Sequence, residues 1–179
     1  MILGGVWLLY FSFGLTVAAM APLVKPITDE LGLSHSAMGG ILGAWPLVYI
    51  AAAIPCGALL DRVGIRRSLF LAILIIGASG AFRAISNDHL SLFLAVGLFG
   101  IGGPLVSVGA PKAITLWFEG KERGLAMGLY ITGPALGGVI ALSLTNSILM
   151  PLVGHDWRRA LLTYAAFAAA SGFVWLAIS

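Results

Sequence analysis

The sequence has few charged residues. Asp, Glu, Lys and Arg together make up 9% of its 179 residues, whereas soluble domains contain about 25%. Hydrophobic residues make up 60% of the chain, compared with roughly 45–50% in soluble domains. A water-soluble fold needs a polar surface that this composition cannot supply, which excludes a soluble globular protein, a disordered chain and a coiled coil.

Cysteine and catalytic groupings are also scarce. The single cysteine, Cys56, excludes an internal disulfide and a multi-cysteine metal site. The three histidines, His35, His89 and His155, are far apart and are expected to be polar residues at membrane interfaces. No nucleophile–base pair or carboxylate dyad falls within an apolar run, which argues against an enzyme. The ten basic residues form no stripe, so we expect no nucleic-acid partner. The scarcity of ligand and catalytic groupings likewise leads us to expect no cofactor and no metal.

What the sequence has instead is long apolar runs. A membrane-spanning helix takes about 20 residues, and the runs predict an all-α membrane protein, a six-transmembrane-helix bundle in a single domain over residues 1–179. The expected spans cover residues 2–24, 34–60, 68–85, 90–117, 124–149 and 157–179. Lys25-Pro26 and Asp29-Glu30 are expected to form the first loop.

Glycine is concentrated in these spans. Three pairs at a spacing of four, Gly39 with Gly43, Gly124 with Gly128 and Gly133 with Gly137, each share one helix face. Small residues let transmembrane helices approach closely. Two interpretations follow from the spacing: static close packing, or smooth faces on which helices slide and rock.

The most specific segment is Gly57-Ala58-Leu59-Leu60-Asp61-Arg62-Val63-Gly64-Ile65-Arg66-Arg67. It resembles the signature between helices 2 and 3 of the major facilitator superfamily: a glycine, three residues, an aspartate, a basic residue, then a glycine and a basic pair. The signature positions are Gly57, Asp61, Arg62, Gly64, Arg66 and Arg67. The resemblance implies one six-helix half of a transporter that works by alternating access.

The residues of this segment have separable roles. Gly57 is expected to let its helix approach a neighbour, and Gly64 to allow a turn with positive φ. The resemblance implies that Asp61 is a gate residue, which pairs with basic residues and with a helix end in the other half. A carboxylate at a helix N-terminus gains only about 0.3–1 kcal/mol, so such a contact can form and break. The alternative is that Asp61 and the pair Arg66-Arg67 only anchor the loop at the membrane surface.

A second resemblance lies in the fifth span. The run from Gly133 to Gly138 resembles part of the Gly-Pro motif on helix 5 of superfamily antiporters, with Leu129 in the place of an upstream glycine. Its motif positions are Gly133, Pro134, Gly137 and Gly138. Pro134 is expected to free a backbone carbonyl and bend the helix. Trp157-Arg158 resembles the start of helix 6 in many members.

Other stretches resemble one branch of the superfamily and depart from others. Residues 100–104, 109–112, 117–118 and 122–128 look most like the cyanate-permease-type branch, whose members are known or presumed to move small anions and related solutes. Many proton-coupled members carry an arginine inside helix 4, and Val96 stands there instead. The span interiors hold no Asp or Glu, which are the usual intramembrane proton carriers. This chain by itself therefore offers no proton relay.

The loop charges and the resemblance together predict an orientation. Lys and Arg are nearly balanced between the two sides, so the resemblance decides: both termini and the loop 61–67 are expected in the cytoplasm, in a bacterial inner (plasma) membrane. Arg83 is then an interfacial anchor at the outer end of the third span. Lys112 either reaches the interface with its long side chain or attracts an anion in the cavity.

A substrate site is expected near the membrane midplane. Polar or aromatic side chains near midspan are the candidates for lining the cavity, although each is alternatively a residue packed against lipid. The candidates are Tyr10, Thr16, Trp45, Tyr49, Ser107, Lys112, Tyr130 and Thr132.

The length matches only half of the superfamily architecture, since a facilitator has two six-helix halves. We expect a fragment or truncated product whose partner is the missing C-terminal six-helix half, or a second copy of the chain, in a lipid bilayer. The predicted function is secondary active transport of a small solute, such as a small organic or inorganic anion. The alternative is a truncated, non-transporting half that only binds a partner helix bundle.

Overall fold

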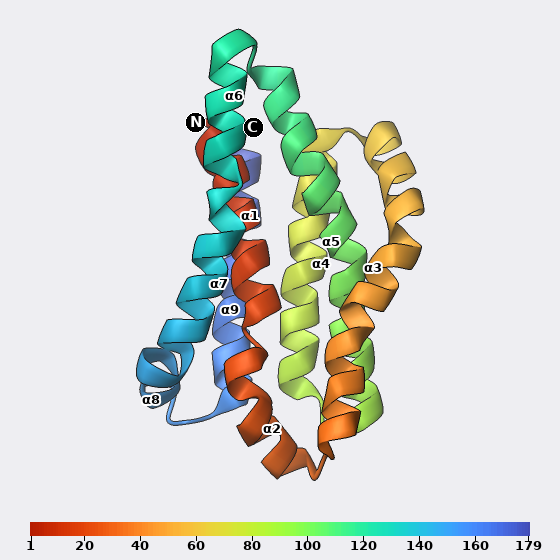
Figure 1. Cartoon of the computed structure of the whole chain (residues 1–179), viewed down its shortest axis with the longest axis vertical. Helices are drawn as coiled ribbons and strands as arrows, with labels where there is room; N and C mark the ends of the chain where they lie inside the picture. The colour runs from red at the N-terminus through yellow and green to blue at the C-terminus, as the bar shows by residue number, and fades with distance from the viewer.

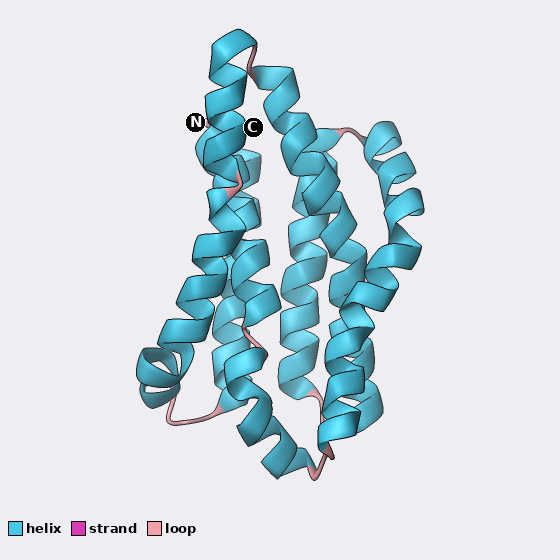
Figure 2. Cartoon of the chain, viewed as in Figure 1, coloured by secondary structure: helices cyan, strands magenta, loops and turns pink.

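The computed structural model describes all 179 residues, and it is helical throughout, with short connections and no strands (Figure 2). Six helical stretches are long and apolar enough to cross a membrane. This confirms the predicted all-α bundle of six spans. The helices, labelled in Figure 1, are α1 (Ile2–Ala18), α2 (Val24–Leu31), α3 (His35–Val63), α4 (Ile65–Ile85), α5 (His89–Trp117), α6 (Gly120–Tyr130), α7 (Thr132–Leu144), α8 (Met150–Leu152) and α9 (Trp157–Ile178).

The first span is longer than predicted. After α1, a single 3-10 turn (Ala21–Leu23) leads directly into α2, so residues 25–30 are helical and the predicted loop there is wrong. Lys25 pairs with Asp29 one turn further on, at 2.7 Å, which makes this polar segment compatible with a helix. The helix ends at Gly32, whose φ of +62° favours glycine.

The fifth span is interrupted where its proline predicts. The helix breaks at Ile131, between α6 and α7, because Pro134 supplies no backbone N–H to the carbonyl of Tyr130. Beyond α7, a π-helical turn (Thr145–Leu149) and the short helix α8 extend the stretch to Leu152. The predicted single helix over residues 124–149 is thus three segments on one path.

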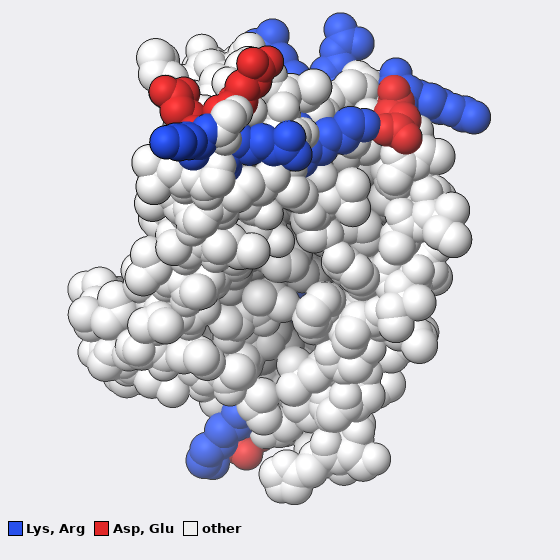
Figure 3. All heavy atoms as spheres, turned by 45° about the horizontal axis from the view of Figure 1, so that its top comes forward, with Lys and Arg blue, Asp and Glu red and all other residues white.

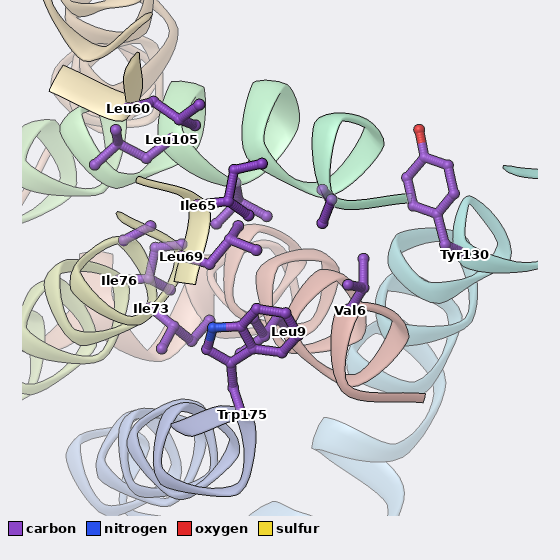
Figure 4. Close-up of a cluster of buried hydrophobic side chains, with 14 of the residues drawn as sticks. Val6, Leu9, Leu60, Ile65, Leu69, Ile73, Ile76, Leu105, Tyr130 and Trp175 are labelled. Carbon is purple, nitrogen blue, oxygen red and sulfur yellow. The ribbon is translucent and has the colours of Figure 1, made fainter. Parts of the chain in front are cut away.

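The long helices pack around a shared buried cluster. α5 packs against both α3 and α4, α4 packs against α9, and α1 packs against α7 and α9. Figure 4 shows the buried cluster between them, in which Leu9, Leu69, Ile73 and Trp175 come from α1, α4 and α9. Lipid tails are as apolar as these side chains, so close van der Waals packing holds the helices together.

Glycines decide where the backbones come closest. A Cβ on Gly137 would overlap the carbonyl oxygen of Phe11, and one on Gly14 would overlap the backbone of Pro134. The Gly-Pro motif is therefore the contact surface of α7 on α1. By contrast, a Cβ on Gly39 or Gly43 would meet no atom of this chain. Gly14 and Gly137 therefore pack inside the bundle, whereas Gly39 and Gly43 do not.

On the face shown in Figure 3, the exposed charged side chains gather at the two ends, and the long stretch between them is almost entirely uncharged and hollowed near its middle. Both termini lie at the end that carries the α3–α4 connection (Figure 1), where Arg66 donates to the hydroxyl of Ser179. We call this the Asp61 end, and the opposite end, with the α4–α5 turn, the Asp88 end.

Candidate functional site

An ion pair joins α3 to α5 at the Asp61 end. Asp61 lies in the last turn of α3, and its carboxylate accepts a hydrogen bond from the ammonium of Lys112 at 2.5 Å. The Asp61 side chain is 68% exposed and that of Lys112 is 41% exposed. An exposed pair of this kind contributes about 0–1 kcal/mol, so it can break at little cost.

The two glycines of the signature behave differently. Gly64 separates α3 from α4 with a φ of +86°, a conformation that glycine adopts without a steric penalty, as predicted. Gly57 does not bring α3 near a neighbour in this chain, because a Cβ there would meet nothing within 4 Å. The expected close approach at Gly57 is therefore wrong for the contacts within the chain.

The basic residues of the signature do not pair with Asp61. The Arg66 guanidinium donates to the carbonyl of Leu176 at 2.6 Å, and the indole of Trp175 donates to the carbonyl of Arg66 at 2.9 Å. These bonds tie the start of α4 to the end of α9. Arg62 and Arg67 are exposed and free of ion pairs, and Arg62 lies in the last turn of α3, where the helix dipole favours a cation.

A continuous row of aromatic rings connects α6, α1, α5 and α3 through the bundle. Tyr130 of α6 stacks on Tyr10 of α1 at 5.5 Å, and Tyr10 contacts Phe13 at 5.7 Å. Phe13 stacks on Phe99 of α5 at 5.2 Å, and Phe99 meets Trp45 of α3 at 5.7 Å. We call these residues, together with Tyr49 and Ser107, the aromatic wall.

Two hydrogen-bonded hydroxyl groups are the polar part of the wall. Tyr49 and Ser107 share a hydrogen bond of 2.6 Å between α3 and α5. Gly103 makes room for this arrangement, since a Cβ there would lie 2.7 Å from the Tyr49 ring and 3.6 Å from Phe13. Both hydroxyl-bearing side chains are half-buried, whereas Phe99 and Tyr130 are buried, so the wall combines packed aromatic rings with partly exposed hydrogen-bonding groups.

Three predicted cavity residues do not join the wall. Thr16 is buried, and its hydroxyl donates to the carbonyl of Ser12 in its own helix. Thr132 instead accepts a bond of 2.9 Å from the indole of Trp7. Lys112 forms an ion pair with Asp61 at the end of the bundle. Five of the eight predicted residues therefore come together: Tyr10, Trp45, Tyr49, Ser107 and Tyr130.

Arg83 lies in the interior of the bundle and not at the membrane interface. Arg83 is only 1% exposed and is not an interfacial anchor. Its Nη1 donates to the carbonyl of Thr16 at 3.4 Å, and its guanidinium carbon lies 5.3 Å from the centre of the Phe99 ring. The signal that could have found it is its position in α4, where small and apolar residues surround it in sequence.

A second arginine closes the Asp88 end. Arg158, at the start of α9, donates to Glu30 at 3.0 and 3.2 Å and to the carbonyls of Ala84 and Ser86. The indole of Trp157 donates to the other oxygen of Glu30 at 2.5 Å. The Trp157-Arg158 pair therefore fastens α2, the α4–α5 turn and α9 together.

The sequence is similar to those of known membrane transporters. Residues 6–179 match the family model of the Major Facilitator Superfamily. The chain is 30% identical over 98% of its length to the 2-nitroimidazole transporter of Escherichia coli K12, covering 44% of that protein. It is 32% identical over 67% of its length to the D-galactonate transporter of E. coli O6:H1, covering 28%. It is 29% identical over 93% of its length to a protein of Cupriavidus necator named probable sulfoacetate transporter, covering 38%. The chain thus spans less than half the length of these relatives.

Proposed function

Because the chain belongs to the major facilitator superfamily, we propose that it forms one half of the pathway of a secondary transporter for a small organic anion. Residues 1–179 would form the single six-helix domain of that half. The aromatic wall is the observation that carries the proposal, because its hydroxyl pair, Tyr49 and Ser107, is half-exposed within an apolar bundle.

The wall has the chemistry of a solute site. Small-molecule sites combine aromatic surface with a few placed polar groups, and the wall supplies Tyr49 and Ser107 on helices α3 and α5. In this superfamily the substrate lies between the two halves at the midplane. Polar groups that face lipid cost free energy, so this surface favours a second set of helices over it.

Open glycine faces support the same arrangement. Gly39, Gly40 and Gly43 on α3, and Gly124 and Gly128 on α6, would all accept a Cβ without meeting any atom of the chain. We propose that these faces receive the second six-helix half or a second copy of the chain. Close backbone approach at small residues is the usual basis of such helix contacts.

The pair of Asp61 and Lys112 would serve as the gate at its end of the bundle. It lies at the helix ends, it is exposed, and its small free energy lets it open during a cycle. Rocking of two halves exposes a midplane site to each side in turn. An Asp61 carboxylate that leaves Lys112 could then accept donors from the partner half.

Flux measurement tests the proposal. The chain would be reconstituted in proteoliposomes, alone and co-expressed with the C-terminal half of a superfamily relative, and supplied with D-galactonate, sulfoacetate or 2-nitroimidazole. Saturable uptake in either preparation supports transport. Uptake by the chain alone would identify a second copy as the partner, and uptake only after co-expression would identify the C-terminal half. A folded chain with no flux in both would instead support a non-transporting half that binds other helices.

The orientation is part of the same proposal. Six basic residues gather at the Asp61 end, including the partner of Asp61 and the exposed Arg62 and Arg67, and cytoplasmic ends carry such an excess. We place this end, with both termini, in the cytoplasm of a bacterial inner membrane. Single cysteines introduced at Arg67 and at Arg159, in a Cys56→Ser background, should react with a membrane-impermeant maleimide from opposite sides of the membrane.

A further inference from the structure

We propose that Arg83 binds the oxyanion group, a carboxylate or a sulfonate, of the transported solute. The inference rests on the proposed transport function and adds the residue that recognises the anion. Arg83 is the only Lys or Arg side chain among the buried residues of the protein, and no acidic side chain pairs with it.

The guanidinium has one free edge. Nη1 makes a long bond of 3.4 Å to the Thr16 carbonyl, Nε is buried without a partner, and Nη2 donates to no protein group. Nε and Nη2 form the side of the fork that a carboxylate can occupy with two parallel hydrogen bonds. The edge suited to bidentate recognition is therefore the edge that the protein leaves empty.

No carboxylate of this chain can fill that edge. The four acidic residues of the Asp88 end all have other partners: Asp29 pairs with Lys25, Glu30 with Arg158, and Asp156 with Arg159, while Asp88 caps α5. The remaining three, Asp61, Glu119 and Glu122, lie at the Asp61 end. A second copy of the chain has the same distribution, so the counter-charge has to come from a different molecule.

The position of the guanidinium connects it to the aromatic wall. Helical side chains lean toward the N-terminus of their helix, which carries the Arg83 head group from the end of α4 toward the membrane interior. Thr16 lies at the middle of the 30-residue first span. Phe99, on which the guanidinium rests, is itself a wall residue in contact with Phe13 and Trp45. A solute on the wall would thus have an oxyanion site beside the Phe99 ring.

Binding requires a movement. Arg83 is 1% exposed in this structure, so an oxyanion reaches it only when α1 and the Phe99 ring give way. Charged groups buried without a partner are costly in a membrane interior, and solute binding at this edge would relieve that cost. Solute binding would then shift the population toward the conformation in which the site is open.

The test is calorimetric titration of the purified chain in detergent at constant ionic strength. The probes are gluconate as the carboxylate, methanesulfonate as the sulfonate and glucitol as the uncharged polyol. We expect saturable binding of one or both anions and none of glucitol. Arg83→Gln should weaken anion binding at least tenfold, and Arg83→Lys should weaken it less, because lysine keeps the charge and loses the fork.

Arg159→Gln is the matched control, because Arg159 is an exposed arginine at the same end and its loss should leave binding unchanged. Unchanged affinity in a folded Arg83→Gln protein would overturn the inference. If that variant does not fold, equal affinity of Arg83→Lys and the native chain would overturn it instead.

Anion binding at Arg83 and solute flux can fail independently of each other. Anion binding through Arg83 in a chain without flux supports this site and refutes transport by the chain alone. Flux without any Arg83-dependent binding refutes this site only. If no free anion binds and Arg83→Gln weakens association with a second half, the counter-charge is a carboxylate of that half and the solute assignment is wrong.

Discussion

Substituting Gly137 with alanine should loosen the contact between α1 and α7. A Cβ at this position would overlap the carbonyl oxygen of Phe11 and lie 2.7 Å from the backbone nitrogen of Leu15. Both atoms belong to the backbone of α1, so no side-chain rotation can relieve the overlap. The two helices would have to separate by several tenths of an ångström to about 1 Å to restore ordinary contact.

The expected cost follows from this geometry. Inserting a group into a packed interior costs about 1–3 kcal/mol, whereas replacing glycine by alanine in a helix gains about 0.5–1 kcal/mol. Gly137→Ala should therefore lower the free energy of unfolding by about 1–2 kcal/mol. Gly138→Ala is the matched control, because its Cβ would lie 3.9 Å from that of Ala18, an ordinary contact, and should leave stability unchanged or slightly raised.

Thermal unfolding in a mild detergent, followed by far-UV circular dichroism, measures the difference. At about 2–4 °C per kcal/mol, Gly137→Ala should unfold at least about 2 °C below the native chain, and Gly138→Ala should not. The α1 side of the contact also carries Tyr10, which stacks on Tyr130 of α6, so the first variant should also transport less. Equal unfolding temperatures for both variants would refute the packing argument.

Three further changes test the gate, the wall and a helix cap. Asp61→Asn should reduce solute flux while lowering stability by less than about 1 kcal/mol, because its pair with Lys112 is exposed; unchanged flux in a folded variant would exclude a gating role. Tyr49→Phe removes the wall hydrogen bond and should cost about 0.6 kcal/mol while raising the KM for flux, and an unchanged KM would exclude solute contact there. The backbone N–H of Ser91 lowers the pKa of Asp88, so this carboxylate stabilises the fold above its unfolded pKa and the stabilisation is lost as the pH falls through its folded pKa. Acid titration below about pH 4 should therefore destabilise the native chain more than Asp88→Asn, and parallel titration curves would contradict this.

The interior of the site was harder to predict than the helices that carry it. Residue type and midspan position predicted Tyr10, Trp45, Tyr49, Ser107 and Tyr130 as cavity residues, and the structure places these five in the aromatic wall. The same criterion also selected Thr16, which is buried, and Thr132, which is exposed and bonded to Trp7, because these helices are apolar on every side and their sequence does not reveal which face turns inward.

Charged residues show the same limit. Lys112 was predicted to reach the interface or attract an anion, and it binds Asp61, 51 positions away in sequence. Arg83 was predicted at the interface because it lies near a helix end. Its long side chain leans back into the bundle, and only the placement of α1 and α5 beside α4 makes that environment buried.

The sequence by itself determined the spans, the α3–α4 turn and the break in the fifth span. Backbone groups in lipid must be satisfied within each segment, so long apolar runs can only be helices, and Gly64 and Pro134 act on the backbone locally. Tertiary structure decided which glycines pack inside, which cation meets Asp61 and where Arg83 is buried. These outcomes depend on the relative rotation of neighbouring helices, which is set by contacts between residues distant in sequence.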